Sequence, residues 1–301
     1  MLAGIVLSRA GGRYQVFAEG RVVEASLRGR MKRIGEEQVL VGDRVALAVH
    51  EVGAATIERV DERHSVLQRR SPGRARGPRP VAANLDQVVV VGSARMPDWN
   101  PYLIDRFTAV AAANHLPAIV VINKTDLDDS AAMHGDAYRR AGYPVLVTSA
   151  KTDVGLGELR GRLSGHVSLF TGPTGVGKSS LLNALVPGLT LRTGAVSPRS
   201  RAGRHTTVAA EMHPIGDAGF VVDTPGLRDV GLWGLDPAEV AAAFPEFARH
   251  QGDCRFDNCR HRGEPACAVR GAVDRGELAR TRYESYLRML EEAEAAARPW
   301  A

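Results

Sequence analysis

The segment Gly172-Pro173-Thr174-Gly175-Val176-Gly177-Lys178-Ser179 has the G-x-x-x-x-G-K-S spacing of a phosphate-binding loop. An apolar run at 167–171 precedes it, and Ser180 opens the apolar segment 180–185, so the context is strand, loop and helix. The glycines let backbone amides turn inward around a phosphate, and the helix N-terminus adds positive charge. We predict that residues 172–180 hold nucleotide phosphates, with Lys178 at the β- and γ-phosphates and Ser179 on Mg²⁺. The alternative is a glycine-rich loop that binds no ligand.

The chain around this loop alternates between apolar runs and helical segments, which is typical of an α/β domain. Continuous apolar runs predict strands that are buried on both faces, and therefore a parallel sheet covered by helices. The predicted strands are 88–91, 118–122, 144–148, 167–171 and 219–222, and the predicted helices include 103–113 and 156–163. Together they predict a central domain over residues 84–232.

Two short motifs favour guanine over adenine as the base. Asn123-Lys124-Thr125-Asp126 directly follows the predicted strand 118–122, and Ser149-Ala150-Lys151 follows 144–148. Both therefore lie at the carboxyl ends of strands, where such sheets bind ligands. The Asp126 carboxylate can accept the N1 and N2 protons of guanine, whereas adenine would leave it unpaired. Asn123 would tie the loop to its neighbours, Lys124 would lie along the base, and the second motif would place a backbone amide at the base oxygen. A P-loop kinase, an alternative class of enzyme, would leave both motifs without a role.

A further nucleotide motif, Asp223-Thr224-Pro225-Gly226, follows the predicted strand 219–222 and matches D-x-x-G. Asp223 would hold Mg²⁺ through a water molecule, and the Gly226 amide would sense the γ-phosphate. GTPases ordinarily begin with the P-loop and end with the guanine motifs, whereas this chain has the guanine motifs first. The order predicts a circularly permuted P-loop GTPase domain, which is tolerated where the original termini lie close together.

The N-terminal 70 residues predict a small β-barrel. Turn signals separate five short strand candidates, 4–8, 14–18, 21–27, 43–49 and 56–60. Five is the strand number of the OB-fold, although a generic small barrel has the same pattern. A basic loop at 28–33 interrupts the strands, and a segment rich in proline, glycine and arginine predicts a basic linker over 71–83. That linker is either solvated or in contact with phosphates.

All three cysteines of the chain lie in one window near the C-terminus. Cys254, Cys259, His261 and Cys267 supply three thiolates and one imidazole, the ligand set of a closed, structural zinc site. An odd number of cysteines argues against a disulfide framework, and the alternative is three buried, reduced thiols. We predict a helical zinc-binding domain over 233–301, with a final helix from residue 276 to about 297.

Composition excludes several classes of protein. The 301 residues include 44% hydrophobic and 24% charged residues, an ordinary globular composition, and the apolar runs are too short to cross a bilayer. The N-terminus lacks the basic region of a secretory signal. We therefore expect a cytoplasmic monomer without a membrane partner. The net charge of +5 favours polyanionic partners only mildly.

The whole chain resembles the ribosome small-subunit-dependent GTPase A family of bacteria. The likeness rests on the motif order, the barrel, the cysteine window, Gly203-Arg204-His205-Thr206-Thr207, and Tyr283-Glu284-Ser285-Tyr286-Leu287. It implies an assembly factor that binds GTP and GDP with Mg²⁺, binds the maturing small ribosomal subunit through its rRNA, and hydrolyses GTP when the subunit stimulates it. It also implies an RNA-binding OB-fold in front of the GTPase domain and the zinc domain behind it. An RNA-binding module in which GTP only sets the conformation, and hydrolysis is incidental, is the alternative.

One expected catalytic group is missing from the sequence. Many GTPases have a glutamine directly after D-x-x-G that orients the attacking water, and this chain has Leu227 there. His205, in the segment that resembles the first switch, is the candidate replacement, because a neutral imidazole can position water or accept a proton. The alternative is a loop histidine that contacts solvent or RNA. We assign Mg²⁺ coordination to Thr207, with Thr206 as the second choice.

Overall fold

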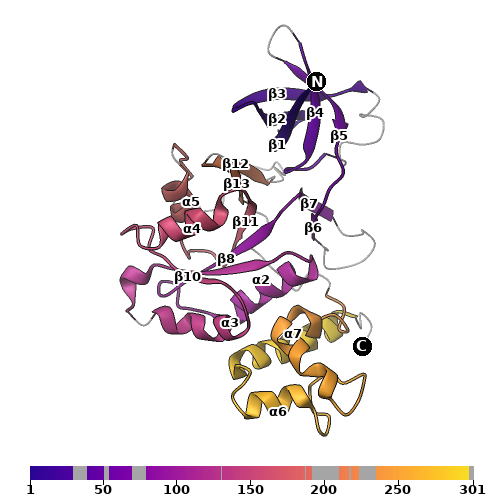
Figure 1. The fold of residues 1–301 in the computed structure, drawn as a ribbon, viewed down its shortest axis with the longest axis vertical. Helices are drawn as coiled ribbons and strands as arrows, with labels where there is room; N and C mark the ends of the chain where they lie inside the picture. Colours follow the sequence, from indigo (N-terminus) through magenta and orange to yellow (C-terminus); the bar gives the residue numbers. More distant parts are fainter. Residues whose placement is uncertain are drawn as a thin grey trace, which may run out of the picture. The chain divides into compact units, whose positions relative to one another are not determined.

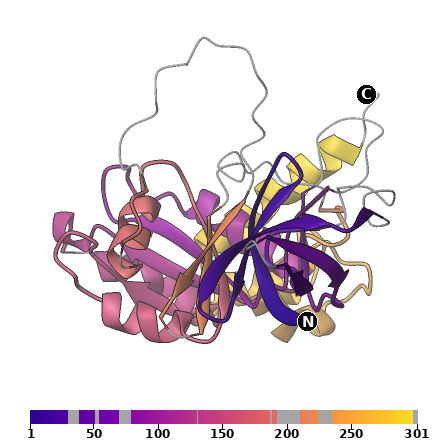
Figure 2. The same cartoon turned by 90° about the horizontal axis from the view of Figure 1, so that it is seen from above.

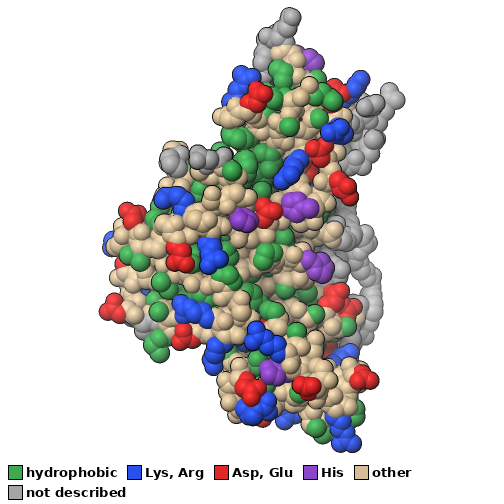
Figure 3. Space-filling view, viewed as in Figure 1, with side chains coloured by type: hydrophobic (Ala, Val, Ile, Leu, Met, Phe, Trp, Pro, Cys, Tyr) green, Lys and Arg blue, Asp and Glu red, His purple; other side chains and the backbone are tan. Residues whose placement is uncertain are grey.

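The computed structural model describes residues 1–29, 39–50, 54–69, 79–129, 131–186, 188–191, 210–216, 218–223 and 235–297. These residues divide between two compact units. The first contains the described parts of 1–87, 162–170 and 196–227, and the second those of 88–161, 171–195 and 228–301. Within the described ranges, every helix is too short or too polar to span a bilayer. On the face drawn in Figure 3, basic and acidic side chains are interspersed rather than gathered by sign.

The five N-terminal strands close into a barrel in the order β1-β2-β3-β5-β4, as predicted (Figures 1 and 2). Neighbours are antiparallel except β3 and β5, which run parallel. Buried and exposed residues alternate along β3, and the inward-facing side chains form a core that includes Tyr14, Leu47 and Ile57. The strands are β1 (Leu2–Ala10), β2 (Arg13–Ala18), β3 (Arg21–Leu27), β4 (Arg44–Val49) and β5 (Ala55–Val60).

The last part of the predicted linker 71–83 is a strand rather than a linker. β6 (Val66–Arg69) pairs antiparallel with β7 (Arg79–Ala83), so the last five residues of the segment 71–83 form a strand. Residues 71–78 lie outside the described ranges. Two alanines of β7, Ala82 and Ala83, are fully buried, and the Ala83 amide donates to the Val41 carbonyl at 2.9 Å. Proline in a strand suggests a linker, but a strand tolerates proline beside a β-bulge, and the β6–β7 register shifts next to Pro80.

The central domain contains a six-stranded sheet in the order β10-β9-β8-β11-β13-β12 (Figure 1). Every residue of β8 and β9 is buried, as the apolar runs predicted. The strands are β8 (Gln87–Ser93), β9 (Ala118–Asn123), β10 (Val145–Val147), β11 (Val167–Thr171), β12 (Glu211–Ile215) and β13 (Gly219–Asp223). The sequence predicts a parallel sheet, but the sheet is mixed, because β12 runs antiparallel to β13. β12 could not be predicted from the sequence, because Glu211–Ile215 includes Pro214 and lacks a continuous apolar run.

Among the described residues, four α-helices accompany these strands: α2 (Pro101–Ala113), α3 (Asp136–Arg140), α4 (Leu156–Leu163) and α5 (Lys178–Leu185). The start of α2 follows from its sequence. Asn100 caps the helix by accepting the Leu103 amide at 3.2 Å, and Pro101 takes the first helical position, where a missing N–H costs nothing. Shorter 3-10 turns are η2 (Thr125–Leu127) and η3 (Ala131–Gly135).

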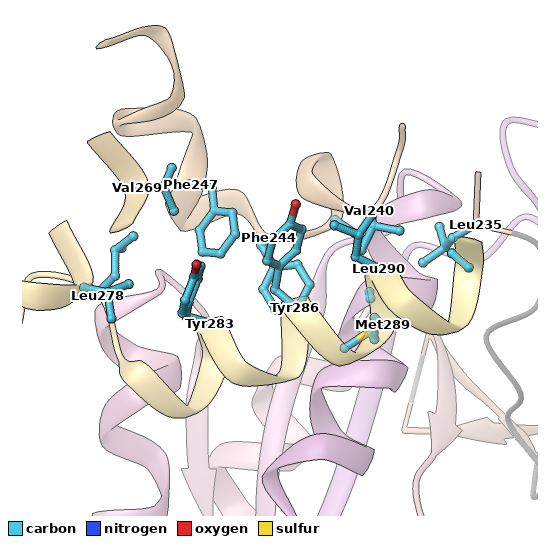
Figure 4. Packing of buried hydrophobic residues seen from close by; sticks show 14 of the residues in the cluster. Leu235, Val240, Phe244, Phe247, Val269, Leu278, Tyr283, Tyr286, Met289 and Leu290 are labelled. Atoms are coloured by element: carbon cyan, nitrogen blue, oxygen red, sulfur yellow. The ribbon is translucent and has the colours of Figure 1, made fainter. Parts of the chain in front are cut away.

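The C-terminal region is helical, as predicted, and it packs around an aromatic core. Tyr283 and Tyr286 project from α7 toward Phe244 and Phe247 (Figure 4). The final helix begins at Arg280 rather than at residue 276, because Gly276 has φ +76° and closes the preceding helix. The elements are η5 (Ala241–Ala243), η6 (Pro245–Arg249), η7 (Gln251–Asp253), α6 (Ala268–Asp274) and α7 (Arg280–Ala297).

Candidate nucleotide site and metal centre

The P-loop joins β11 to α5, as its flanking residues predicted. Gly172 has φ +136°, and a Cβ there would lie 2.0 Å from the Val91 carbonyl oxygen, so only glycine fits. Gly177 has φ +95°, and a Cβ there would lie 2.4 Å from Asn123 Nδ2. The Lys178 ammonium donates to the carbonyls of Gly172 and Pro173, both at 2.7 Å. The loop therefore has the curled backbone and inward lysine that a phosphate-binding loop requires.

Asn123 is the residue that connects the three sequence motifs of this unit. Its side chain is buried, and its Nδ2 donates to the Val176 carbonyl in the P-loop at 2.9 Å. Its Oδ1 accepts from the Ala150 amide and from the Thr148 hydroxyl, both at 3.3 Å. The structure thus brings 123–126, 149–151 and the P-loop together, although they lie far apart in the sequence.

Asp126 is held by the other guanine motif. The Ser149 hydroxyl donates to Asp126 Oδ1 at 2.7 Å, and Lys151 Nζ lies 4.0 Å from Oδ2. The Asp126 side chain is 14% exposed, so one carboxylate oxygen is fixed by the protein while the group remains within reach of a ligand. An oriented carboxylate of this kind can accept two parallel N–H bonds from the edge of a planar base.

Ser149→Ala tests this arrangement. We expect it to weaken GTP binding on the order of 10-fold, because hydrogen bonds to charged groups contribute roughly 1.5–3 kcal/mol. Equilibrium binding of GTP measures the effect, and Ser164→Ala, an exposed serine elsewhere in the chain, serves as the matched control. Unchanged affinity for Ser149→Ala would show that Asp126 needs no help from this hydroxyl.

One hydrogen-bond partner of Lys124 could not be predicted from the sequence. Lys124 has φ +62°, and its ammonium donates to the Gly175 carbonyl at 2.7 Å and to the Met96 carbonyl. Met96 lies in the loop between β8 and α2, which carries no recognisable motif. A cavity of about 310 Å³ lies beside this loop, lined by residues that include Pro97, Leu103, Pro173 and Thr174. Lysine contacts to backbone carbonyls leave no signal in a single sequence.

The remaining predicted nucleotide residues are only partly described. Asp223 is the last residue of β13, half-buried, and lies opposite Phe170 of β11 and Glu211 of β12 in the strand register. The predictions for His205, Thr206, Thr207, Gly226 and Leu227 fall outside the described residues.

The four predicted metal ligands converge on one point. Their ligand atoms all lie within 4.8 Å of one another, and His261 Nδ1 is 3.5 Å from the sulfurs of both Cys254 and Cys267. A tetrahedral zinc ion with ordinary bond lengths separates sulfur and nitrogen ligands by about 3.6 Å. Cys254, Cys259 and Cys267 are not joined by disulfides. The cluster therefore fits Zn²⁺ in both chemistry and spacing.

The protonation of the cluster also suits a cation. Burial, together with the neighbouring Cys267 and Cys254 side chains, raises the pKa of the Cys259 thiol to about 12 against the opposing effect of a backbone hydrogen bond at His261. Burial lowers the pKa of His261 against the pull of Glu264, which favours the neutral imidazole that binds metals. Closely packed thiols of this kind become thiolates when a divalent cation is bound.

Three further side chains form hydrogen bonds to the backbone of the loop that carries these ligands. Tyr283 donates to the His261 carbonyl at 2.6 Å, and Tyr286 donates to the Arg260 carbonyl. The Glu264 carboxylate accepts the backbone amides of Arg260, Arg262 and Gly263 at 2.7–3.0 Å. Burial alone would raise the pKa of Glu264, but these amides outweigh it and lower the pKa to about 2. The two tyrosines belong to the segment 283–287 that carries the family resemblance, whereas nothing in the sequence indicates that Glu264 binds these amides.

A guanine-type pocket, a P-loop and their reversed order in the chain define a circularly permuted P-loop GTPase. The chain matches the RsgA GTPase family over residues 60–233 and the RsgA N-terminal domain family over 3–57. The chain belongs to the RsgA family of GTPases.

Individual relatives agree with this assignment. The chain is 49% identical to "Small ribosomal subunit biogenesis GTPase RsgA" of Gemmatimonas aurantiaca, with 96% of each chain covered. It is 42% identical to the protein of the same name from Moorella thermoacetica, with 100% of each covered. Its fold is similar to the crystal structure of YjeQ from Thermotoga maritima, with a TM-score of 0.79 and 37% identity over 97% of this chain and 98% of that one. It is also similar to YloQ, described as a circularly permuted GTPase, with a TM-score of 0.77 and 28% identity over 100% of this chain and 98% of that one.

Proposed function

We propose that this GTPase assists or checks a late step in maturation of the small ribosomal subunit, and that the subunit stimulates its GTP hydrolysis. The observation that carries the proposal is the full-length similarity to relatives named as small-subunit biogenesis GTPases. The arrangement of Asn123, Asp126 and Ser149 around the P-loop supports GTP as the nucleotide. Binding to rRNA would involve the OB-type barrel and the arginine-rich zinc domain, in a cytoplasmic monomer.

Each nucleotide motif has an assigned role in this proposal. The backbone of residues 172–180 and Lys178 hold the phosphates, and Ser179, Thr207 and Asp223 bind Mg²⁺ directly or through water. Gly226 senses the γ-phosphate, Asp126 recognises the guanine edge, and Lys124 lies along the base. When bound, Mg²⁺ would be held by Ser179, Thr207 and Asp223 and would neutralise charge that develops on the phosphates.

Hydrolysis needs a water that attacks the γ-phosphorus in line with the leaving oxygen. Leu227 has no polar atom to orient that water. His205 is the group we assign to this task, acting when GTP and the subunit are bound. We therefore expect GTP hydrolysis to be slow without the subunit and fast on it.

Hydrolysis of GTP with and without purified small subunits tests the proposal. We expect a large increase in rate with small subunits and none with large subunits. Equal rates in all three conditions would favour the RNA-binding module in which hydrolysis is incidental.

His205→Ala tests the proposed catalytic group. We expect almost unchanged affinity for a non-hydrolysable GTP analogue and a fall in subunit-stimulated hydrolysis on the order of 10²-fold, as for loss of a general base or water-orienting group. His115→Ala, an exposed histidine after α2, is the matched control. Normal hydrolysis by His205→Ala on the subunit would make the ribosome the source of the catalytic group.

A further inference from the structure

A buried ion triad connects the C-terminal domain to α2. Arg282 of α7 donates through Nη1 to Asp105 of α2 at 2.7 Å. Its Nε and Nη2 donate to the two carboxylate oxygens of Glu246 in η6 at 2.7 and 3.0 Å. The three side chains are only 2%, 0% and 4% exposed. Arg282 donates to Oδ1 of Asp105, while Oδ2 has no hydrogen-bond partner within the described part of the chain. Separating these buried groups would leave uncompensated charges, so the position of α2 relative to α7 is tightly specified.

Aromatic rings extend this contact toward the start of α2. The Arg282 guanidinium lies over the rings of Tyr138 and Tyr143, 5.4 and 5.2 Å from their centres. Tyr138 in turn meets Trp99 edge to face, with ring centres 5.8 Å apart. Trp99 is the residue before the Asn100 helix cap. Arg282 therefore contacts α2 directly and the loop before it through one intervening ring.

The loop between β8 and α2 forms a hydrogen bond to the Lys124 side chain. Its Met96 carbonyl accepts from the Lys124 ammonium, which also donates to Gly175 of the P-loop at 2.7 Å. Trp99 packs on the strand beneath, since a Cβ at Gly92 would lie 2.4 Å from its ring. A change in the packing of Trp99 or the angle of α2 would move the Met96 carbonyl and with it the lysine.

We propose that Arg282, although it belongs to the C-terminal domain, is a positioning residue for the nucleotide site, acting on Lys124 through α2 and its preceding loop. The inference rests on the proposed role of Lys124 at the guanine base, and it is independent of the ribosome. It makes the C-terminal domain a part of the nucleotide site rather than an appended module. A merely structural Arg282 would affect folding without any specific link to Lys124.

A double-mutant cycle on the full-length protein tests the proposal, with GDP binding measured by calorimetry. Arg282→Lys keeps the charge but cannot reach both carboxylates, and we expect it to weaken GDP binding on the order of 10-fold. Lys124→Met should weaken it at least as much. The double variant should bind no more weakly than Lys124→Met alone, because both changes remove the same contact. Arg280→Met, an exposed arginine on the same helix, is the matched control and should bind GDP normally.

Three results separate the possible outcomes. Effects that add in the double variant, or a folded Arg282→Lys that binds GDP normally, would overturn the inference while leaving Lys124 in its role. Normal GDP binding by Lys124→Met would overturn both. Circular dichroism checks folding, and Asp105→Asn is the second variant if Arg282→Lys does not fold. Unstimulated hydrolysis gives an independent readout: KM for GTP should rise with kcat unchanged, as expected for a contact made equally to substrate and transition state.

Discussion

Asp126→Asn is expected to lower the affinity for GTP on the order of 10²- to 10⁴-fold and to raise the affinity for xanthosine triphosphate. Guanine presents two N–H donors to the carboxylate, and two hydrogen bonds to a charged group contribute about 3–6 kcal/mol together. Ser149 donates to Oδ1, so an asparagine would keep Oδ1 toward the serine and turn its amide nitrogen toward the base. That nitrogen repels the guanine edge and suits the carbonyl of xanthine.

Equilibrium binding of both nucleotides to the wild type and the variant measures this exchange of preference. Asp129→Asn, an exposed aspartate three residues further on, is the matched control and should leave both affinities unchanged. If Asp126→Asn binds GTP as the wild type does, residues 123–126 are not the base-reading loop.

Removal of the predicted zinc ion is expected to unfold the C-terminal region, residues 235–297. Freshly purified, reduced protein should contain about one Zn²⁺ per chain. Structural zinc contributes about 10–16 kcal/mol in zinc-finger peptides, far more than the core of a small helical domain can replace. The ligand His261 lies in the same core as Phe247 and Tyr286, so loss of the ion should loosen the packing of these rings. Calorimetric unfolding should lose one transition after chelation and regain it when zinc is restored.

Substitution of a ligand should have the same effect as chelation. His261→Ala should lose both the metal and the transition, whereas His250→Ala, which is outside the ligand set, should retain both. Metal analysis that finds no zinc in wild-type protein prepared without chelators would contradict the assignment of this site.

The elements that could be predicted from the sequence are those with a local cause. The spacing of the P-loop and the apolar runs that a buried strand requires located β11 to the residue and the start of α5 to within two residues. The cysteine window named four ligands because zinc accepts few donor sets and because no cysteine lies elsewhere.

The elements that could not be predicted depend on distant partners. β7 is a strand because Val41 and β6 supply its hydrogen bonds, while its own residues resemble a linker. β12 is stabilised by β13 in the same way. Arg282 looks like any arginine on a polar helix face, and only the fold brings Asp105, from 177 positions earlier, to its guanidinium.

The permuted order of the strands has a consequence for how the chain is made. β8, β9 and β10 and the two guanine motifs come from residues 87–151, and β11, β12 and β13 come from residues 167–223, so each half of the sheet is one continuous stretch of chain. Contacts that are local in sequence form early, and the N-terminal part of a nascent chain folds first. The base-reading half is therefore synthesised before the first residue of the P-loop. Arg282 emerges later still, so the newly made protein acquires its full affinity for GTP only as its last helix is released.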